Sequence, residues 1–343
     1  MSASQEEKHL RENNVQVPKI SVVIPSYNGE AFIGKAIRSV LNQTFQDFEV
    51  LVVDDCSTDG TRDEVRRFEA IDKRVRLFTL KKNSGGPASP SNLGIGKSRG
   101  EYVSYLDQDD IYLPDSLEKR WRVLQGAKTD VLIANMWVVD LRSNKFIDYL
   151  NSNFSSFIIS RKMFDKGEIG LLSEEASGID EYEWSLRYRL KNGGERIRYF
   201  EEPAVLYARH PGQMSESHYS EKSIKDFLRR DFVVLKWAEM GGNDFRVDLA
   251  WIYFWIGYRY GLLGEFDHSR RYLEKSLDNG ASLVARTFLL VGLVRSRPLY
   301  VAVDKAAKWI KKIFIKRWRL NSMVKKYPAS YRDALAFYGK ITS

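Results

Sequence analysis

The sequence of 343 residues contains one cysteine, Cys56, and no long uninterrupted apolar run. A single cysteine excludes an intramolecular disulfide and a zinc site made only of cysteines, and it fits a reducing compartment. The most apolar stretch, Leu249–Tyr258, is closed by Arg259, so we expect no membrane-spanning helix, which needs about 20 apolar residues. Residues 1–17 are polar, lack the apolar core of a signal peptide and are expected to form a flexible leader.

The basic residues are distributed unevenly. The formal net charge is +9, and residues 301–343 hold 11 Lys and Arg against 2 Asp and Glu, so the rest of the chain is electrically balanced. The overall charge is therefore no argument that the main domain binds nucleic acid, and we expect no nucleic-acid partner. Hydrophobic residues make up 43% of the chain, which is enough for one large domain and a smaller one.

Short apolar runs alternate with segments of helical spacing in the first third of the chain. The runs expected to form strands there are Lys19–Pro25, Phe48–Val53, Val75–Leu80 and Tyr102–Leu106. Further strands are expected at residues 130–139, 157–159 and 199–207, and a loop at residues 83–92. Alternating strands and helices predict an α/β fold with a parallel sheet and crossover helices. From about residue 218 the pattern is helical, which predicts an all-α C-terminal region.

Polar turns follow three of the expected strands, at Pro25–Asn28, Asp54–Asp55 and Asp107–Asp110. In parallel sheets, ligands bind outside the carboxyl ends of the strands, so these turns should meet at one edge. The closely spaced carboxylates of the third turn repel one another, and a cation between them would relieve the repulsion. Taken alone, however, this turn fits a solvated acidic loop before a helix equally well.

Five motifs occur in order: Val-Val-Ile-Pro-Ser-Tyr-Asn-Gly29, Val-Val-Asp-Asp-Cys-Ser-Thr-Asp-Gly-Thr61, Gly-Glu-Tyr-Val-Ser-Tyr-Leu-Asp-Gln-Asp-Asp110, Asp-Glu-Tyr-Glu-Trp-Ser-Leu-Arg187 and Arg-His-Pro-Gly212. Their order and spacing resemble the family 2 glycosyltransferases of the GT-A fold, over roughly residues 18–215. The resemblance implies a GT-A domain at 18–217, with a Rossmann-like mixed, mostly parallel sheet flanked by helices. It also implies a nucleotide-sugar donor, UDP- or dTDP-linked, a divalent cation (Mn²⁺ or Mg²⁺) and inversion at the anomeric carbon.

The resemblance also assigns the acidic turn. Asp109 matches the metal-binding end of an Asp-x-Asp motif, and Asp107 is its first carboxylate. Hard cations prefer such oxygen ligands, and a cation here would neutralise the leaving diphosphate. Asp110 is expected to orient the loop or the sugar hydroxyls.

The same resemblance places the donor nucleotide. Asp55 matches the carboxylate that accepts a hydrogen bond from the base, typically from N3–H of uracil or thymine. Pro25 and Tyr27 match a turn that lies along the base and the ribose, where Tyr27 could stack. Glu30 matches an acidic residue near the nucleoside. The other residues expected to bind the donor are Ser26, Gly86, Pro87, Asn92 and Gln108.

An inverting transfer needs one general base, and the family keeps it in an acidic pair six positions before an arginine. Counting back from Arg187 gives Glu181, preceded by Asp180. The order Asp-Glu reverses the commoner order, so the base is either residue, and we favour Glu181. Without the other motifs, this segment would be interpreted as a solvated helix start with favourable acidic residues in its first turn.

The segment that crosses the sugar diphosphate in the family departs from the usual pattern here. The family often has Ala-Arg-Asn, whereas this chain has Ser-Pro-Ser-Asn92 and so lacks the arginine. Gly85 and Gly86 would permit close backbone approach to a phosphate, although a plain turn has the same composition. Positive charge must then come from the metal or from Arg209 and His210, which match a segment that closes over the donor.

The C-terminal third falls outside the resemblance. Residues 250–278 resemble one tetratricopeptide-type helical hairpin, and a further helix is expected at 281–294. Residues 301–320 form a basic amphipathic pattern, which fits a helix on an anionic membrane or a cap on the accessory region. The expected location is thus the cytoplasm or the inner face of the plasma membrane. The acceptor would be a carbohydrate or a lipid-linked glycan, and homo-oligomers are left open.

Two other functions fit parts of the sequence. A nucleotidyltransferase would need a Gly-rich, basic phosphate loop after the first strand, and Pro25–Gly29 is not one. A non-catalytic GT-A-like scaffold would bind nucleotide at most and would lose nothing when Glu181 is replaced by alanine.

Overall fold

A computed structural model describes residues 17–126, 128–143, 145–150, 154–165, 168–211, 213, 220–280, 288, 297–310 and 316–342. The chain divides into two compact units. The first comprises Met1–Leu172, Gly194–Arg209 and Arg319–Ser343, and the second comprises Ser173–Gly193 and His210–Trp318. The division therefore differs from the predicted boundary at residue 217, because each unit is assembled from separate stretches of the chain.

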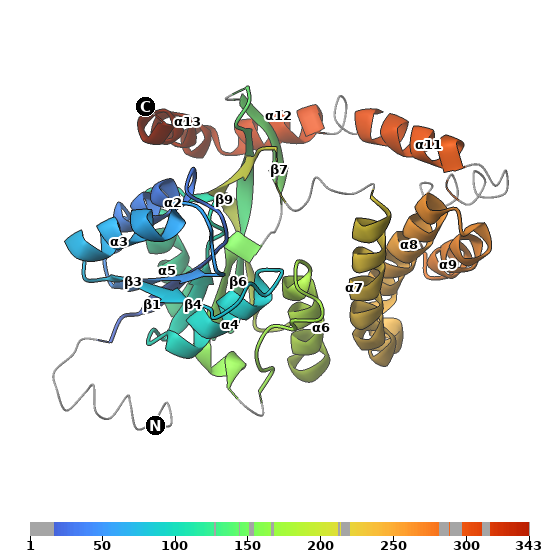
Figure 1. Cartoon of the computed structure of the whole chain (residues 1–343), viewed down its shortest axis with the longest axis horizontal. Helices are drawn as coiled ribbons and strands as arrows, with labels where there is room; N and C mark the ends of the chain where they lie inside the picture. The colour runs from blue at the N-terminus through green and yellow to red at the C-terminus, as the bar shows by residue number, and fades with distance from the viewer. Residues whose placement is uncertain are drawn as a thin grey trace. The chain divides into compact units, whose positions relative to one another are not determined.

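Four parallel strands make up one half of the sheet in the first unit (Figure 1). They are β1 (Ile20–Ser26), β2 (Phe48–Asp54), β3 (Val75–Thr79) and β4 (Tyr102–Tyr105). The helices that connect them are α2 (Ile33–Leu41), α3 (Thr61–Ile71) and α4 (Ala88–Lys97). Since crossovers between parallel strands are right-handed, α2 and α3 lie on one face of these strands and α4 lies on the other.

The other half of the sheet is mixed. Its elements are β5 (Ile111–Tyr112), α5 (Ser116–Gly126), β6 (Val131–Asp140), β7 (Lys145–Leu150), β8 (Phe157–Ser160) and β9 (Ile197–Arg209), with 3₁₀ turns η1 (Phe154–Ser156) and η2 (Arg161–Phe164). The strand order is β3-β2-β1-β4-β8-β6-β9-β5, and β7 pairs with β6. Strand β8 runs antiparallel to both neighbours, whereas β6 and β9 are parallel. The predicted α/β class with a mixed sheet is confirmed, although parallel pairing dominates only in its first half.

The loop predicted at residues 83–92 is only partly a loop, because α4 begins at Ala88. Pro87 occupies the N-cap position, and Pro90 lies in the first turn. Proline is tolerated there because the first turn of a helix leaves its N–H groups without helical partners. The Gly-Gly-Pro-Ala-Ser-Pro sequence therefore ends a loop and starts a helix.

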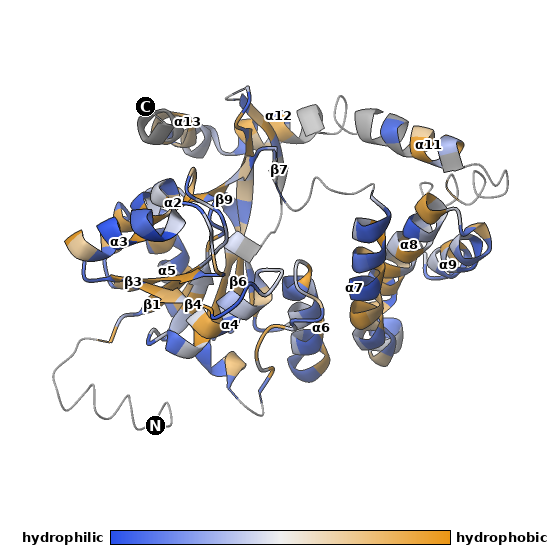
Figure 2. Ribbon diagram, in the orientation of Figure 1, coloured by the Kyte–Doolittle hydropathy of each residue, from blue (hydrophilic) through white to orange (hydrophobic). Residues whose placement is uncertain are grey.

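Strands β1 and β2 are buried at every residue, as expected for parallel strands covered on both faces. The strands of this sheet are largely orange in Figure 2. A second apolar cluster joins β6 and β9 to the C-terminal helices α12 (Lys316–Lys326) and α13 (Pro328–Thr342). In it the rings of Trp137 and Tyr331 lie 5.4 Å apart. Outside it, the Nζ atom of Lys326 lies 2.5 Å from a carboxylate oxygen of Glu201.

The second unit is helical. It contains α6 (Asp180–Asn192), α7 (Glu221–Met240), the 3₁₀ turn η4 (Gly242–Phe245), α8 (Arg246–Leu263), α9 (Phe266–Asp278) and α11 (Arg297–Ile310). The segment predicted as a hairpin forms α8 and α9, and Gly264 between them has a left-handed φ of 84°. A β-carbon at Gly257 would lie 2.9 Å from the carbonyl oxygen of Ser269, so glycine allows these two helices to approach closely.

Several predicted segments lie wholly or partly outside the described residues. They are the leader up to residue 16, the helix at 281–294 apart from residue 288, and residues 311–315 of the basic helix. None of the helices in the described ranges is both long enough and apolar enough to span a membrane.

Candidate active site

The three polar turns predicted to meet do lie at one edge of the first unit's sheet. Strands β1, β2 and β4 are neighbours and parallel, so their carboxyl ends point the same way. Ser26 is paired with Asp54 at the end of β1, and Val23 is paired with Tyr105 just before the acidic turn. Residues separated by about 80 positions in the sequence are therefore adjacent at this edge.

The side chain of Gln108 connects the acidic turn to the turn after β1. Its Oε1 accepts hydrogen bonds from the hydroxyl of Ser26 at 2.7 Å and from the backbone N–H of Tyr27 at 2.9 Å. Its Nε2 donates to the carbonyl oxygen of Tyr27 at 3.0 Å. A β-carbon at Gly29 would lie 2.1 Å from Oε1, so any larger residue at position 29 would displace the amide. Gln108 thus fixes the position of Asp107 and Asp109 relative to β1.

The turns after β1 and β2 are also linked to each other. Asn28 has a left-handed φ of 47°, which asparagine tolerates better than most residues. Its backbone N–H donates to the hydroxyl of Ser57 at 2.9 Å, and its side-chain oxygen accepts from the N–H of Thr58 at 2.8 Å. The carboxylate of Glu30 accepts from the N–H of Gly60 at 2.9 Å. Glu30, predicted to lie near the nucleoside, is thereby positioned at this edge by a backbone contact.

Asp55 is buried beneath the loop that precedes α4. The backbone N–H and the hydroxyl of Ser84 donate to its carboxylate at 2.8 and 2.9 Å, and Asn83 donates to its carbonyl oxygen at 3.0 Å. Burial raises the pKa of Asp55, and the hydrogen bonds from Ser84 act in the opposite direction. The role of Ser84 could not be predicted from the sequence, because its contact with Asp55 joins residues 29 positions apart.

The three carboxylates of the acidic turn have different surroundings. Asp107 and Asp109 are half-buried, whereas Asp110 is fully buried and accepts a hydrogen bond from the N–H of Ala208 at 3.1 Å. Burial, and then the charges of Asp109 and Asp107, raise the pKa of Asp110 well above its usual 3.8. Asp110 therefore anchors the acidic turn to β9. The hydroxyl of Ser155 also supports this turn, because it accepts a hydrogen bond from the N–H of Asp107 at 2.9 Å.

A divalent cation fits this charge distribution, because two accessible carboxylates lie beside a buried third. In the described part of the chain, no group of three or more His, Cys, Asp or Glu side chains is arranged to hold a metal ion. Asp107 and Asp109 could supply two ligands, and the other oxygens would have to come from the donor and from water. This is the usual arrangement for a cation that binds with a phosphate substrate.

The other predicted donor residues lie around the same edge. The ring of Tyr27 is 47% exposed and is available for stacking. The hydroxyl oxygen of Ser84 also lies 3.0 Å from the carbonyl oxygen of Gly86, and Pro87 occupies the N-cap position of α4. Asn92 lies on α4, and its side-chain amide pairs with the backbone N–H and C=O of Leu172, both at 2.9 Å. That pairing makes Asn92 an anchor for the segment that ends the first unit's main stretch.

The two acidic candidates for the base lie in the second unit, at the start of α6. Asp180 is 1% exposed, accepts from the N–H of Gly178 at 2.6 Å and has its pKa raised to about 6 by burial. Glu181 is half-buried. One turn later, Glu183 and Arg187 form a buried two-point ion pair at 2.7 and 2.9 Å. Only the four-residue spacing of that pair could have predicted it.

The remaining two candidates lie on either side of the division between the units. Arg209 ends β9 in the first unit, where its carbonyl oxygen accepts from the N–H of Leu141 at 2.9 Å. His210 begins a stretch of the second unit, and its Nδ1 lies 2.9 Å from the carbonyl oxygen of Pro211.

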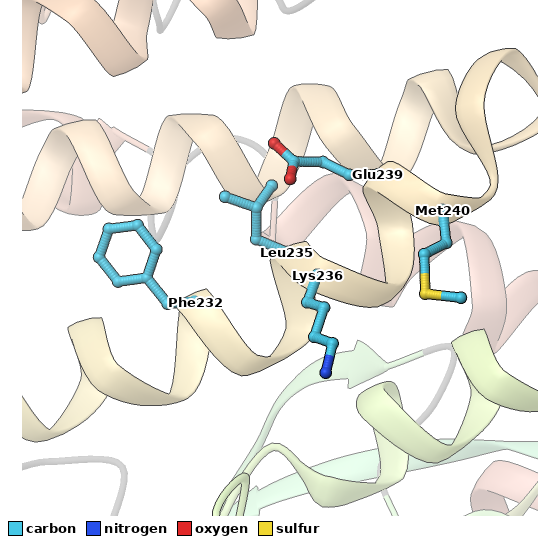
Figure 3. A pocket seen from close by; sticks show the side chains of 5 residues that line it. All are labelled: Phe232, Leu235, Lys236, Glu239 and Met240. Carbon is cyan, nitrogen blue, oxygen red and sulfur yellow. The ribbon is translucent and has the colours of Figure 1, made fainter.

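A shallow hollow in the second unit lies along α7 and is lined by Phe232, Leu235, Lys236, Glu239 and Met240 (Figure 3). Its acidic side chain is already occupied, since Glu239 accepts from the hydroxyl of Tyr253 at 2.7 Å. The hollow holds no group of catalytic side chains, so the candidate active site remains at the carboxyl edge of the sheet.

The sequence matches the glycosyl transferase family 2 over residues 21–181. This stretch is a family 2 glycosyltransferase domain. It contains all three turns at the carboxyl edge, and it ends at Glu181, so both acidic candidates on α6 fall within it.

Two relatives of this family 2 domain are named for the polymers on which they act. TuaG of Bacillus subtilis, provisionally named a teichuronic acid biosynthesis glycosyltransferase, is 44% identical over 103 residues, which cover 30% of this chain and 40% of TuaG. The poly(ribitol-phosphate) β-N-acetylglucosaminyltransferase TarS of Staphylococcus aureus is 36% identical over 120 residues, 34% of this chain and 21% of TarS. These alignments thus span less than two thirds of each relative.

Solved structures share the fold over more of the chain. TarS residues 1–349 in complex with UDP-GlcNAc superpose with a TM-score of 0.60 at 22% identity, covering 85% of this chain and 92% of that one. The mannosyltransferase PcManGT of Pyrobaculum calidifontis, in complex with GDP-Man and Mn²⁺, gives a TM-score of 0.52 at 15% identity over 92% and 95% of the chains. The family 2 domain therefore has the GT-A fold.

Proposed function

We propose that the protein transfers a sugar from a nucleotide-diphosphate sugar to an acceptor hydroxyl during synthesis of a cell-surface glycan. The observation that carries this proposal is the junction at Gln108, which holds the acidic turn against the turn after β1. That junction brings groups suited to a nucleoside and groups suited to a metal-bound diphosphate to one edge. The names of TuaG and TarS support the glycan class, and the UDP-GlcNAc of the TarS structure supports a UDP-linked donor, with dTDP as the other candidate.

The nucleoside would be held at the ends of β1 and β2. The exposed ring of Tyr27 would stack on the base, while the carboxylate of Asp55 accepts the base N–H. Ser84 already donates two hydrogen bonds to that carboxylate, which orient it. A carboxylate has about four acceptor positions, so Asp55 can bind the base without losing Ser84.

The diphosphate would lie at the acidic turn, where Asp107 and Asp109 are the proposed ligands of Mn²⁺ or Mg²⁺. A bound cation neutralises the charge that develops on the leaving diphosphate. Arg209 and His210 are proposed to add positive charge there. The Mn²⁺ named in the PcManGT complex supports a cation of this type.

The transfer itself requires a base. The acceptor oxygen attacks the anomeric carbon and gives its proton to the carboxylate of Glu181, while the bond from that carbon to the diphosphate oxygen breaks and its electron pair leaves with the diphosphate. Attack opposite to the leaving group inverts the anomeric configuration. We assign the proton to Glu181 because it is half-buried, whereas Asp180 is enclosed and bonded to Gly178.

The test measures nucleotide release from a panel of UDP- and dTDP-sugars with Mn²⁺ and mixed glycan acceptors. Glu181→Gln should lower the turnover rate about 10³-fold with little change in donor affinity, since a general base contributes 10²–10⁴-fold. Asp109→Asn should lower the turnover rate and also weaken donor binding. Glu175→Gln, which changes an exposed carboxylate of the same segment, serves as the matched control.

Two results would count against the enzyme proposal. One is a wild-type protein that binds no nucleotide and turns over no donor. The other is nucleotide binding without turnover, together with a Glu181→Gln variant that behaves as wild type, which would favour the scaffold function. Removal of divalent cations with EDTA should abolish turnover, and added Mn²⁺ should restore it.

A further inference from the structure

A second hollow, of about 550 Å³, lies at the opposite edge of the first unit's sheet. Lys19 precedes β1, Thr129 and Asp130 precede β6, and Arg196 precedes β9. Residues after β8 complete the lining, because β8 is antiparallel and ends at this edge. Strand β1 has seven residues, so this edge is roughly 20 Å from the carboxyl edge. The hollow is therefore separate from the candidate active site.

The hollow is rich in positive charge. The cationic side chains that line it are Lys19, Arg99, Lys128, Arg161, Lys162 and Arg196, against the carboxylates of Glu101, Asp130 and Asp165. Arg99 is neutralised by the buried Glu49 at 2.7 Å, but the remaining five cations still outnumber the three carboxylates. This excess favours an anionic ligand.

Asp130 shows how this charge is arranged. Its carboxylate is 1% exposed, and one oxygen lies 3.1 Å from Arg196 and 3.5 Å from Lys162. One carboxylate thus faces two cations and balances only one of them. Lys128, two residues earlier, is exposed and adds a further positive charge to the same wall.

Two buried hydrogen-bond donors in this wall are left without a partner in the described part of the chain. They are the hydroxyl of Thr129, a residue that is 3% exposed, and the Nε–H of Arg196. An unpartnered buried donor costs about 1–3 kcal/mol, so such groups are uncommon unless something binds them. Both donors belong to residues that line the hollow. Thr129 precedes Asp130 in the chain, and Arg196 is one of the two cations near the Asp130 carboxylate.

We propose that this hollow is a second ligand site and that it binds a phosphate group. Phosphate oxygens accept hydrogen bonds only, which suits the Thr129 hydroxyl, the Arg196 guanidinium and the lysine ammonium groups. The volume exceeds that of one phosphate, so a diphosphate or a phosphate ester fits. The phosphate comes either from a soluble compound or from a lipid headgroup.

The binding test is calorimetric titration of the full chain with inorganic pyrophosphate in EDTA, which keeps the metal-dependent donor site from contributing. Wild type should show saturable binding that weakens as salt is added. The double variant Lys128→Ala/Lys162→Ala, which changes exposed residues, should bind about tenfold or more weakly. Thr129→Val keeps the side-chain shape and should also weaken binding. Lys222→Ala, in the second unit, and Asp109→Asn should bind as wild type.

The source of the phosphate is distinguished by vesicles. If the protein sediments with phosphatidylglycerol vesicles but not with phosphatidylcholine vesicles, and the double variant does not sediment with either, the ligand is a lipid headgroup. Pyrophosphate binding without vesicle binding would assign a soluble phosphate compound. The proposal fails if neither probe binds saturably, or if the double variant and Thr129→Val bind both probes as wild type does. The variant Asp109→Asn should lack transferase activity but retain this second site. Failure of the phosphate-site proposal can therefore be distinguished from failure of the proposed transferase activity.

Discussion

Replacing Asp180 by asparagine should stabilise the protein. The Asp180 carboxyl is almost fully enclosed at the start of α6, and burial raises its pKa from 3.8 to about 6. Asparagine keeps an oxygen to accept the hydrogen bond from the N–H of Gly178, but it carries no charge. The substitution therefore removes a charge that the folded protein holds in an unfavourable place.

The magnitude follows from the two pKa values. The difference corresponds to about 3 kcal/mol of unfavourable ionisation free energy in the folded state at pH 8. The attraction of the helix N-terminus for this carboxylate is already contained in the net pKa. We therefore expect Asp180→Asn to gain about 3 kcal/mol at pH 8. Because the folded protein holds the proton more tightly than the unfolded chain, this carboxyl costs nothing below about pH 4, and its cost grows as the pH rises to 6.

The assay is urea denaturation of both proteins from pH 4 to pH 8. The free energy of unfolding of Asp180→Asn minus that of wild type should be near zero at pH 4 and should reach a plateau above pH 6. Asp244→Asn, an exposed carboxylate of the same unit, should differ from wild type by less than about 0.5 kcal/mol throughout. A variant that is less stable than wild type at pH 8, or a difference independent of pH, would refute the electrostatic reasoning. Nucleotide release should persist in Asp180→Asn, because Glu181 is the proposed base.

Three further outcomes are expected. Gln108→Ala should weaken UDP binding about tenfold by calorimetry, because the acidic turn loses its contacts with the turn after β1; unchanged affinity would show that the junction is dispensable. Gly94→Ala should lower the free energy of unfolding by about 1–3 kcal/mol, since a β-carbon there would lie 2.4 Å from a methyl of the buried Val23. Arg259→Met should cost about 1.4 kcal/mol at pH 8, because Asp231 loses its partner and must take up a proton about one unit above its pKa. That loss should shrink below pH 7, where Asp231, whose pKa burial raises to about 7, takes up a proton.

The central strands could be predicted to within about a residue, because buried parallel strands have continuous apolar runs. Lys19–Pro25 against the observed Ile20–Ser26 is an example. The antiparallel insertion of β8 could not be predicted, since pairing partners are not specified by a four-residue segment. The residues of the three turns could be predicted from the sequence. The contacts by which Ser84 and Gln108 connect these turns could not. Those contacts join residues about 30 and 80 positions apart.

The composition change near residue 218 was a poor guide to the division of the chain. It marks the start of helical sequence, but the final helices pack on β6 and β9 through side chains such as Tyr331 and Ala334. The apolar face of a helix indicates that the helix packs against another element, but it does not indicate which element that is.

This arrangement has a consequence for biosynthesis. A chain emerges from the ribosome from its N-terminus, and domains ordinarily fold as they emerge. Here the apolar cluster around Trp137 stays incomplete until the segment containing Ala334 has been synthesised, almost 200 residues later. The packing around Trp137 therefore stays incomplete while the whole helical unit is synthesised. During that time the exposed apolar surface is a binding site for chaperones. Premature termination within α12 or α13 should lower the stability of the first unit rather than that of the helical second unit.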